Sequence, residues 1–158
     1  QCRRWGSAHS PLIPTSITRM KFTMSHTSPE LFWLGLVCAL TGLMWIPYIV
    51  NRIQELGPPK LAWYPPPDPA PQAAWAARAV RAHMNALENL AIFAPLLLSA
   101  HAMMPGHPTL VAAAQCFASA RLAHYVVCLV GMPIVLRTLT FLAGVAAQMA
   151  VAYLLLTH

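Results

Sequence analysis

The sequence carries very little charge for its length. Asp, Glu, Lys and Arg make up only 9% of its 158 residues, whereas a typical soluble domain has roughly 25%. Hydrophobic residues make up 58%, so the chain has too few polar groups to cover a surface in water and too many apolar groups to stay disordered. We therefore expect that lipid surrounds most of the folded chain.

Acidic residues and metal-binding patterns are also scarce. The chain has four acidic and ten basic residues, but the basic ones lie at the N-terminus or at the apolar segments and form no continuous basic face. Nucleic-acid binding needs such a face, so no nucleic-acid partner is expected. The four cysteines form no CxxC pair and the seven histidines show no HExxH spacing. Neither a disulfide framework nor a metal cofactor is expected.

Four long apolar segments are separated by turns rich in proline and glycine. They cover residues 31–50, 78–104, 109–130 and 137–156. Twenty helical residues cross a hydrocarbon core of about 30 Å, and Pro47 is expected to kink the last turn of the first segment. The turns near Gly106 and Gly131 are short, so the segments they join should be antiparallel. The predicted fold class is an all-α integral membrane protein, a bundle of four transmembrane helices.

The N-terminal region and the first loop lie outside the apolar segments and are not predicted to cross the membrane. Residues 1–28 are expected to be a disordered N-terminal tail that need not be native, and residues 29–158 form the membrane domain. Residues 51–77 are dense in proline, which favours extended polyproline conformations. A flexible linker and a structured loop over the mouth of a site both fit this composition.

The loop charges predict the orientation in the membrane. The first and third loops carry all the loop arginines and the loop lysine, and the positive-inside rule places such loops in the cytoplasm. The basic residues of the tail favour the opposite orientation, but only if that tail is native. Short loops and compact size favour a bacterial inner membrane.

Two charged residues lie deep inside the apolar segments, away from the ends. Glu88 is ten residues beyond Arg78, and Arg121 is ten residues before Gly131, so each should lie about 15 Å from the same membrane face. A charge at such a depth is costly and is usually paired. The spacing therefore predicts a Glu88–Arg121 ion pair.

Polar residues recur at helical spacing around this predicted pair. They are Arg78, Arg81, Asn85, Glu88 and Asn89 in the second segment and Arg121, His124, Tyr125 and Cys128 in the third. With Arg52 and Arg137, five arginines converge on one mouth of the bundle. That excess of positive charge favours an anionic polar ligand, because guanidinium groups bind carboxylates with two hydrogen bonds. The alternative is that Glu88 and Arg121 form a structural clamp while the other arginines anchor the helices at the interface.

Three segments resemble the MAPEG family, the membrane-associated proteins of eicosanoid and glutathione metabolism. The segment RAHMNALEN at residues 81–89 resembles the RAHxNxxE signature of that family. The segments ARLAHY at residues 120–125 and RT at residues 137–138 resemble its third and fourth helices. The resemblance covers residues 31–158. Cys128 stands where family enzymes commonly have a tyrosine that contacts glutathione, and Ile92 stands where many members have a proline.

The resemblance implies a homotrimer that binds glutathione between neighbouring subunits, at a cavity that faces the cytoplasm. Arg137 would stabilise the glutathione thiolate, and Arg52 lies near the place of a first-helix arginine, so both are candidate catalytic residues. A fixed guanidinium lowers the pKa of a thiol, and the thiolate is the nucleophile. The residues that would bind glutathione are Arg81, Asn85, Glu88, Arg121, Tyr125 and Thr138.

Two classes of function follow from this resemblance. The first is a glutathione-dependent transferase or peroxidase, which acts on hydrophobic electrophiles or lipid hydroperoxides. The alternative is a non-catalytic lipid-binding or scaffold protein of the same fold. Glutathione, a lipid-like substrate and membrane lipids are the expected partners. A small transporter is a weaker expectation, because the sequence shows none of the internal repeats that such proteins usually have.

Overall fold

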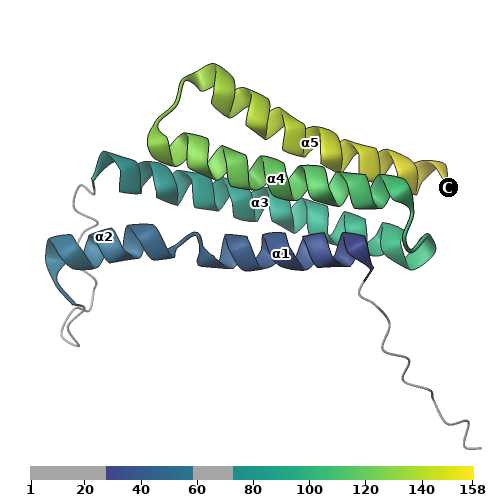
Figure 1. The fold of residues 1–158 in the computed structure, drawn as a ribbon, viewed down its shortest axis with the longest axis horizontal. Coiled ribbons are helices and arrows are strands. Elements are labelled where there is room, and N and C mark those ends of the chain that lie inside the picture. Colours follow the sequence, from purple (N-terminus) through teal and green to yellow (C-terminus); the bar gives the residue numbers. More distant parts are fainter. Residues whose placement is uncertain (1–27, 59–72) are drawn as a thin grey trace, which may run out of the picture.

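The structure, a computed structural model, describes residues 28–58 and 73–158 and contains helices and turns there without any strand. Its helices are α1 (Pro29–Leu43), α2 (Ile46–Leu56), α3 (Ala74–Met103), α4 (Pro108–Val130) and α5 (Ile134–Thr157) (Figure 1). Four stretches are long and apolar enough to cross a membrane: Pro29–Leu56, which joins α1 and α2, and the helices α3, α4 and α5. The predicted all-α bundle with four spans is confirmed. The predicted tail and most of the proline-rich loop lie outside the described residues.

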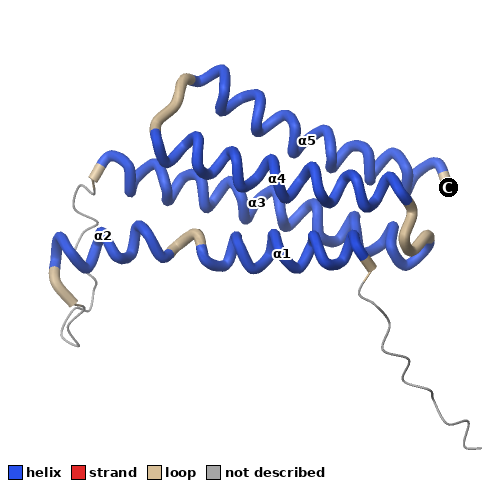
Figure 2. The backbone as a smooth tube through the Cα atoms, viewed as in Figure 1, coloured by secondary structure: helices blue, strands red, loops and turns tan. Residues whose placement is uncertain are grey.

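The first span is interrupted where proline lies near its middle. Helix α1 ends at Leu43 and α2 begins at Ile46, and the two pieces lie almost in line (Figure 2). Pro47 has no N–H group to donate to the carbonyl of Leu43, so the helix cannot continue unbroken. The interruption therefore falls a few residues before Pro47 rather than at a kink on it, and the helix resumes as far as Leu56.

Two tight turns join the last three helices. Gly106 and Gly131 both have positive φ, at 74° and 87°, which glycine adopts without steric cost. We call the end where α1 begins, α3 turns into α4 and α5 finishes the Gly106 end. The opposite end, where α2 finishes, α3 begins and α4 turns into α5, is the Gly131 end. Helix α5 is inclined away from α4 at the Gly131 end and approaches it toward the C-terminus (Figure 1).

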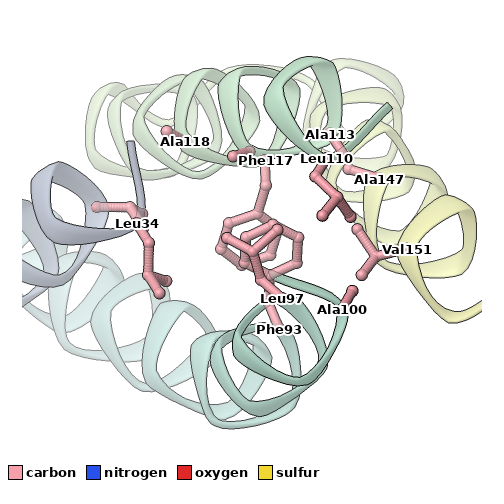
Figure 3. Close-up of a cluster of buried hydrophobic side chains, with 12 residues drawn as sticks. Leu34, Phe93, Leu97, Ala100, Leu110, Ala113, Phe117, Ala118, Ala147 and Val151 are labelled. Carbon is pink, nitrogen blue, oxygen red and sulfur yellow. The ribbon is translucent and has the colours of Figure 1, made fainter. Parts of the chain in front are cut away.

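The main core lies between α3, α4 and α5, and Leu34 and Val37 of α1 pack into it. The rings of Phe93 and Phe117 stack with centroids 3.9 Å apart, and Leu97, Leu110 and Val151 surround them (Figure 3). Alanines on all three helices allow their backbones to approach closely, as in other membrane bundles. The remaining apolar side chains are largely exposed on the outside of the chain, where lipid or another protein chain can cover them.

Candidate functional site

A cleft of about 150 Å³ opens at the Gly131 end of the bundle. It lies between α3, α4 and the start of α5, where α5 is inclined away from α4 (Figure 1). We call it the arginine cleft. Its lining residues are Arg78, Arg81, Ala82, Asn85, His124, Cys128 and Arg137.

Arg78 forms one wall of the arginine cleft by binding the end of α4. Its Nε donates to the carbonyl of Cys128 at 3.1 Å and its Nη2 donates to that of Leu129 at 3.1 Å. A cation stabilises the partial negative charge at a helix C-terminus. Gly131 makes this approach possible, since a Cβ there would lie 3.2 Å from the guanidinium carbon. The glycine turn and Arg78 therefore fix the mouth of the cleft together.

Arg137 contributes from the first turns of α5. Its Nε donates to the carbonyl of Met132 at 2.9 Å, which ties the side chain to the α4–α5 turn. The two terminal nitrogens have no partner among the residues that the structure describes, and the side chain is half-buried in the cleft lining. The two terminal nitrogens of Arg137 can therefore donate hydrogen bonds to a ligand while its Nε stays bound to Met132.

Asn85 lies one turn beyond Arg81 on α3 and is oriented by a buried arginine. Its Oδ1 accepts from Nη1 of Arg121 at 3.3 Å, so its amide NH₂ group is the part available to a ligand in the cleft. Arg81 itself is exposed and makes no hydrogen bond or ion pair within residues 28–58 and 73–158.

Arg121 is a structural cation behind the cleft wall. Only 1% of it is exposed, its Nη2 donates to the carbonyl of Phe141 at 3.1 Å, and its guanidinium carbon lies 5.1 Å from the ring centroid of Phe117 and 5.4 Å from that of Phe141. Such contacts between a cation and an aromatic face stabilise a desolvated guanidinium. Arg121 therefore supports Asn85 rather than lining the cleft.

The sequence matches the pattern that defines the MAPEG family over residues 31–157. The chain belongs to the MAPEG family. No curated protein matches it. The family match covers all four spans, so this MAPEG protein is an integral membrane protein whose arginine cleft lies within the matched region.

One prediction for this MAPEG chain is wrong at the level of the single subunit. Glu88 and Arg121 form no ion pair; Glu88 is exposed, while Arg121 binds Asn85 and the carbonyl of Phe141. Counting residues gave both charges a similar depth, but depth does not fix direction around the helix axis. Glu88 lies about 60° from Asn85 around α3, which turns it away from α4.

The other predicted site residues fall into two groups. Arg81, Asn85 and Arg137 come together in the arginine cleft. Tyr125 and Thr138 do not line it: the hydroxyl of Tyr125 donates to the carbonyl of Met44 at 3.0 Å, and that of Thr138 donates to the carbonyl of Ile134 at 3.0 Å. Arg52, on α2, is half-buried and also lies outside the lining of the cleft.

The cleft also contains residues that the sequence did not single out as ligand-binding. Arg78 was recognised as part of a polar stripe, and its spacing of three residues from Arg81 was the available signal. His124 and Cys128 are four residues apart on α4, which places them on one helix face. The sequence placed both in the polar stripe of the third segment, and the family resemblance put Cys128 at a position that contacts glutathione, but neither was predicted to bind the ligand.

The arginine cleft is strongly cationic. Three guanidinium groups line it, and no carboxylate does. At a distance of about 4 Å and an effective dielectric constant of about 20, each charge attracts a carboxylate by about 4 kcal/mol before the cost of desolvation. In the described ranges no group of three His, Cys, Asp or Glu residues could hold a metal ion. The cleft is therefore built to bind an anionic organic ligand or to stabilise a developing anion.

Proposed function

We propose that this MAPEG protein is a glutathione-dependent membrane enzyme, a transferase that conjugates hydrophobic electrophiles or a peroxidase that reduces lipid hydroperoxides. The observation that carries the proposal is the arginine cleft, with three guanidinium groups and no carboxylate in its lining. Glutathione has two carboxylates for such groups to bind and a thiol that a nearby cation can activate.

Arg137 is the residue we propose to activate the thiol. Its Nε is held by Met132, so the guanidinium is fixed rather than free to move with the ligand. A fixed positive charge stabilises the thiolate over the thiol, and the thiolate attacks the electrophile. The hydrophobic substrate would arrive from the lipid side, where Ile134, Val135 and Leu139 are exposed at the start of α5.

A homotrimer would complete the site. Pockets for ligands of this kind measure roughly 300–1,000 Å³, so a cleft of about 150 Å³ would form one wall of a larger cavity. Glu88 supports the same proposal. It is exposed near the middle of α3, and a charge facing lipid there would be costly. A neighbouring subunit that covers this face would bring Glu88, and Arg52 at the end of the first span, to the glutathione site.

The same charges support an orientation. Arg52, Arg78, Arg81 and Arg137 all lie toward the Gly131 end, which the positive-inside rule places in the cytoplasm. The cytosol holds the glutathione pool. We therefore propose that the arginine cleft opens to the cytoplasm, with the first and third loops, and that the host membrane is a bacterial inner membrane.

Conjugation of glutathione to an aryl chloride tests the enzymatic proposal. The protein in detergent should form the conjugate and release chloride, and Arg137→Leu should lower the rate about 100-fold, because positioned charge stabilisation contributes on this order. Gln115→Leu is the matched control, since Gln115 is exposed on α4 and does not line the cleft. Equal rates for the Arg137 and Gln115 variants would remove the role proposed for Arg137.

A non-catalytic lipid-binding protein is the second candidate, and one apolar groove favours it. The groove has a volume of about 180 Å³ and lies beside the break between α1 and α2. Its lining residues are Leu40, Leu43, Met44, Pro47, Leu122 and Tyr125. Saturable binding of a fatty acid to this groove, with no turnover of glutathione, would favour this candidate over the enzyme.

A further inference from the structure

Cys128 differs from the other cysteines of the described chain in its surroundings. Cys38 and Cys116 are exposed on the outer surface of the bundle. Cys128 instead lines the arginine cleft. Neither the conjugation chemistry proposed above nor the packing of α4 gives its thiol a role.

The thiol of Cys128 is paired with a histidine. Its Sγ lies 3.5 Å from Nε2 of His124, one turn earlier on α4. The other ring nitrogen, Nδ1, lies 3.1 Å from the carbonyl oxygen of Arg137 and 3.2 Å from the hydroxyl of Thr140. That hydroxyl can donate its proton to the carbonyl of Leu136.

These contacts determine which nitrogen of His124 carries the proton. A carbonyl oxygen can only accept, so the Nδ1 of His124 must carry hydrogen to bond Arg137. In the neutral ring Nε2 then has a free lone pair, and it points to the thiol of Cys128. A base held by a third group beside a thiol is the arrangement that activates a cysteine nucleophile.

The cations around Cys128 favour the thiolate and oppose the cost of burying its charge. The cleft that holds its thiol is lined by Arg78, Arg81 and Arg137 and by no carboxylate. Cationic neighbours stabilise a thiolate relative to a thiol. The Cys128–His124 pair is thus a nucleophile and base inside a cationic cleft, while Cys38 and Cys116 lie outside it.

We propose that Cys128 is a catalytic thiol that reduces organic hydroperoxides, with His124 as its base and glutathione as the reductant. The proposal rests on the glutathione binding proposed above for its reductive steps. The arginine cleft would then have a second activity, in which the attacking sulfur belongs to the protein rather than to glutathione.

The reaction balances with the hydroperoxide and two glutathione molecules as its only reactants. His124 takes the proton of Cys128, and the resulting thiolate attacks the terminal oxygen of the hydroperoxide. An S–O bond forms and the O–O bond breaks. The departing alkoxide takes the proton from His124. The products are an alcohol and a sulfenic acid on Cys128. A glutathione thiol then passes its proton to His124 and attacks that sulfur as the thiolate; the S–O bond breaks, the departing hydroxide takes the proton from His124 and leaves as water, and a mixed disulfide remains. A second glutathione thiolate attacks the glutathione sulfur, frees Cys128 and forms glutathione disulfide.

Trapping of the sulfenic acid on the full chain is the direct experiment. The protein in detergent is treated with an aromatic hydroperoxide and a dimedone trap, and the modified peptide is found by mass spectrometry. The trap should modify Cys128 and leave Cys38 and Cys116 unmodified. When a single equivalent of glutathione is added in place of the trap, Cys128 should carry one glutathionyl group, which an excess of glutathione then removes.

Matched variants test the catalytic role. Cys128→Ser should lose hydroperoxide reduction, whereas Cys116→Ser, which replaces a thiol outside the cleft, should keep it. His124→Gln should slow sulfenic acid formation about 100-fold, the low end of what a positioned general base contributes. Each variant is checked for the same assembly size as the unmodified protein, and reactivity of Cys128 toward a neutral alkylating reagent gives a readout that does not depend on substrate binding.

The outcomes separate this proposal from the proposed function. If glutathione binds as a thiolate but Cys128 is never oxidised and Cys128→Ser still reduces hydroperoxide, the catalytic thiol is overturned and the glutathione site remains. If the trap modifies Cys128 but glutathione does not bind, the glutathione-dependent function is overturned and so is the reduction of Cys128 by glutathione. If Cys128 reacts no faster than Cys116 with the alkylating reagent, activation by His124 is overturned.

Discussion

The two ends of the bundle satisfy their charged groups in opposite ways. At the Gly106 end the carboxylate of Glu30 is fully buried, with 0% exposure, and its Oε1 accepts from Nδ1 of His101 at 2.8 Å and from the backbone N–H of Gly106 at 2.7 Å. At the Gly131 end Arg78 and Arg137 donate to backbone carbonyls, and no carboxylate contacts either of them within the described residues.

This difference separates a structural contact from a site. Glu30 joins the start of α1 to the end of α3 and to the α3–α4 turn, so its charge is used in packing these elements together. The cations of the Gly131 end keep their charge available, and they surround a cleft rather than a packed contact. Charge that is not neutralised within a membrane protein is expensive and usually serves function. Substitutions at the two ends should therefore change different properties.

The largest effect should come from removing two positive charges at the Gly131 end. The double substitution Arg81→Leu with Arg137→Leu should weaken glutathione binding at least about 100-fold, because each hydrogen bond to a charged group is worth about 1.5–3 kcal/mol. The melting temperature should fall only slightly, since Arg81 makes no bond within the described residues and Arg137 loses one hydrogen bond, to the carbonyl of Met132. Calorimetric titration measures the affinity; a variant with a much lower melting temperature but an unchanged affinity would reverse the assignment of the two ends.

A substitution at the Gly106 end should lower stability and leave ligand affinity unchanged. Glu30→Ala leaves His101 and the N–H of Gly106 without their acceptor, which should cost about 1–3 kcal/mol of stability. Glutathione affinity should not change. Glu55→Ala is the matched control, because Glu55 is exposed and accepts one hydrogen bond, from the N–H of Ala73. Thermal unfolding in detergent compares the two, and an equal loss for both variants would contradict a special role for Glu30.

The contact behind the cleft should affect stability much as Glu30 does, with only a small effect on affinity. A Cβ on Gly144 would overlap the guanidinium of Arg121, so Gly144→Ala should displace Arg121 and cost about 1–3 kcal/mol through overpacking. The affinity for glutathione should fall only slightly, as Asn85 loses its partner. Gly35→Ala is the control, because a Cβ there meets nothing within 4 Å. A neutral or stabilising Gly144→Ala would show that Arg121 is not held where the structure has it.

The fold was largely predictable from the sequence, for identifiable reasons. Long apolar stretches between turns of glycine and proline predicted four spans, because membrane thickness sets their length. Pro47 predicted a disturbance of the first span, although the break at Met44 and Trp45 precedes it. The steric demands of proline and glycine are local, so they can be recognised without knowing the neighbouring helices.

The site was less predictable because it depends on how the helices are rotated against each other. Residue counts gave Glu88 and Arg121 a common depth. The hydrogen-bond partner of Arg121 is instead Asn85, which precedes Glu88 by three residues on α3. The pairing of His124 with the carbonyl of Arg137 likewise depends on how α5 packs against α4. Spacing along one helix shows which side chains share a face, whereas only packing shows what that face meets.

Equilibrium binding of glutathione to the unmodified protein tests the central claim most directly. Titration in detergent, with the ultraviolet absorbance of the thiolate followed in parallel, should show saturable binding and a thiolate signal that rises with occupancy. The signal should be absent from Arg137→Leu and present in Gln115→Leu. No saturable binding, or binding without any thiolate signal in the unmodified protein, would contradict the assignment of the arginine cleft as a glutathione site.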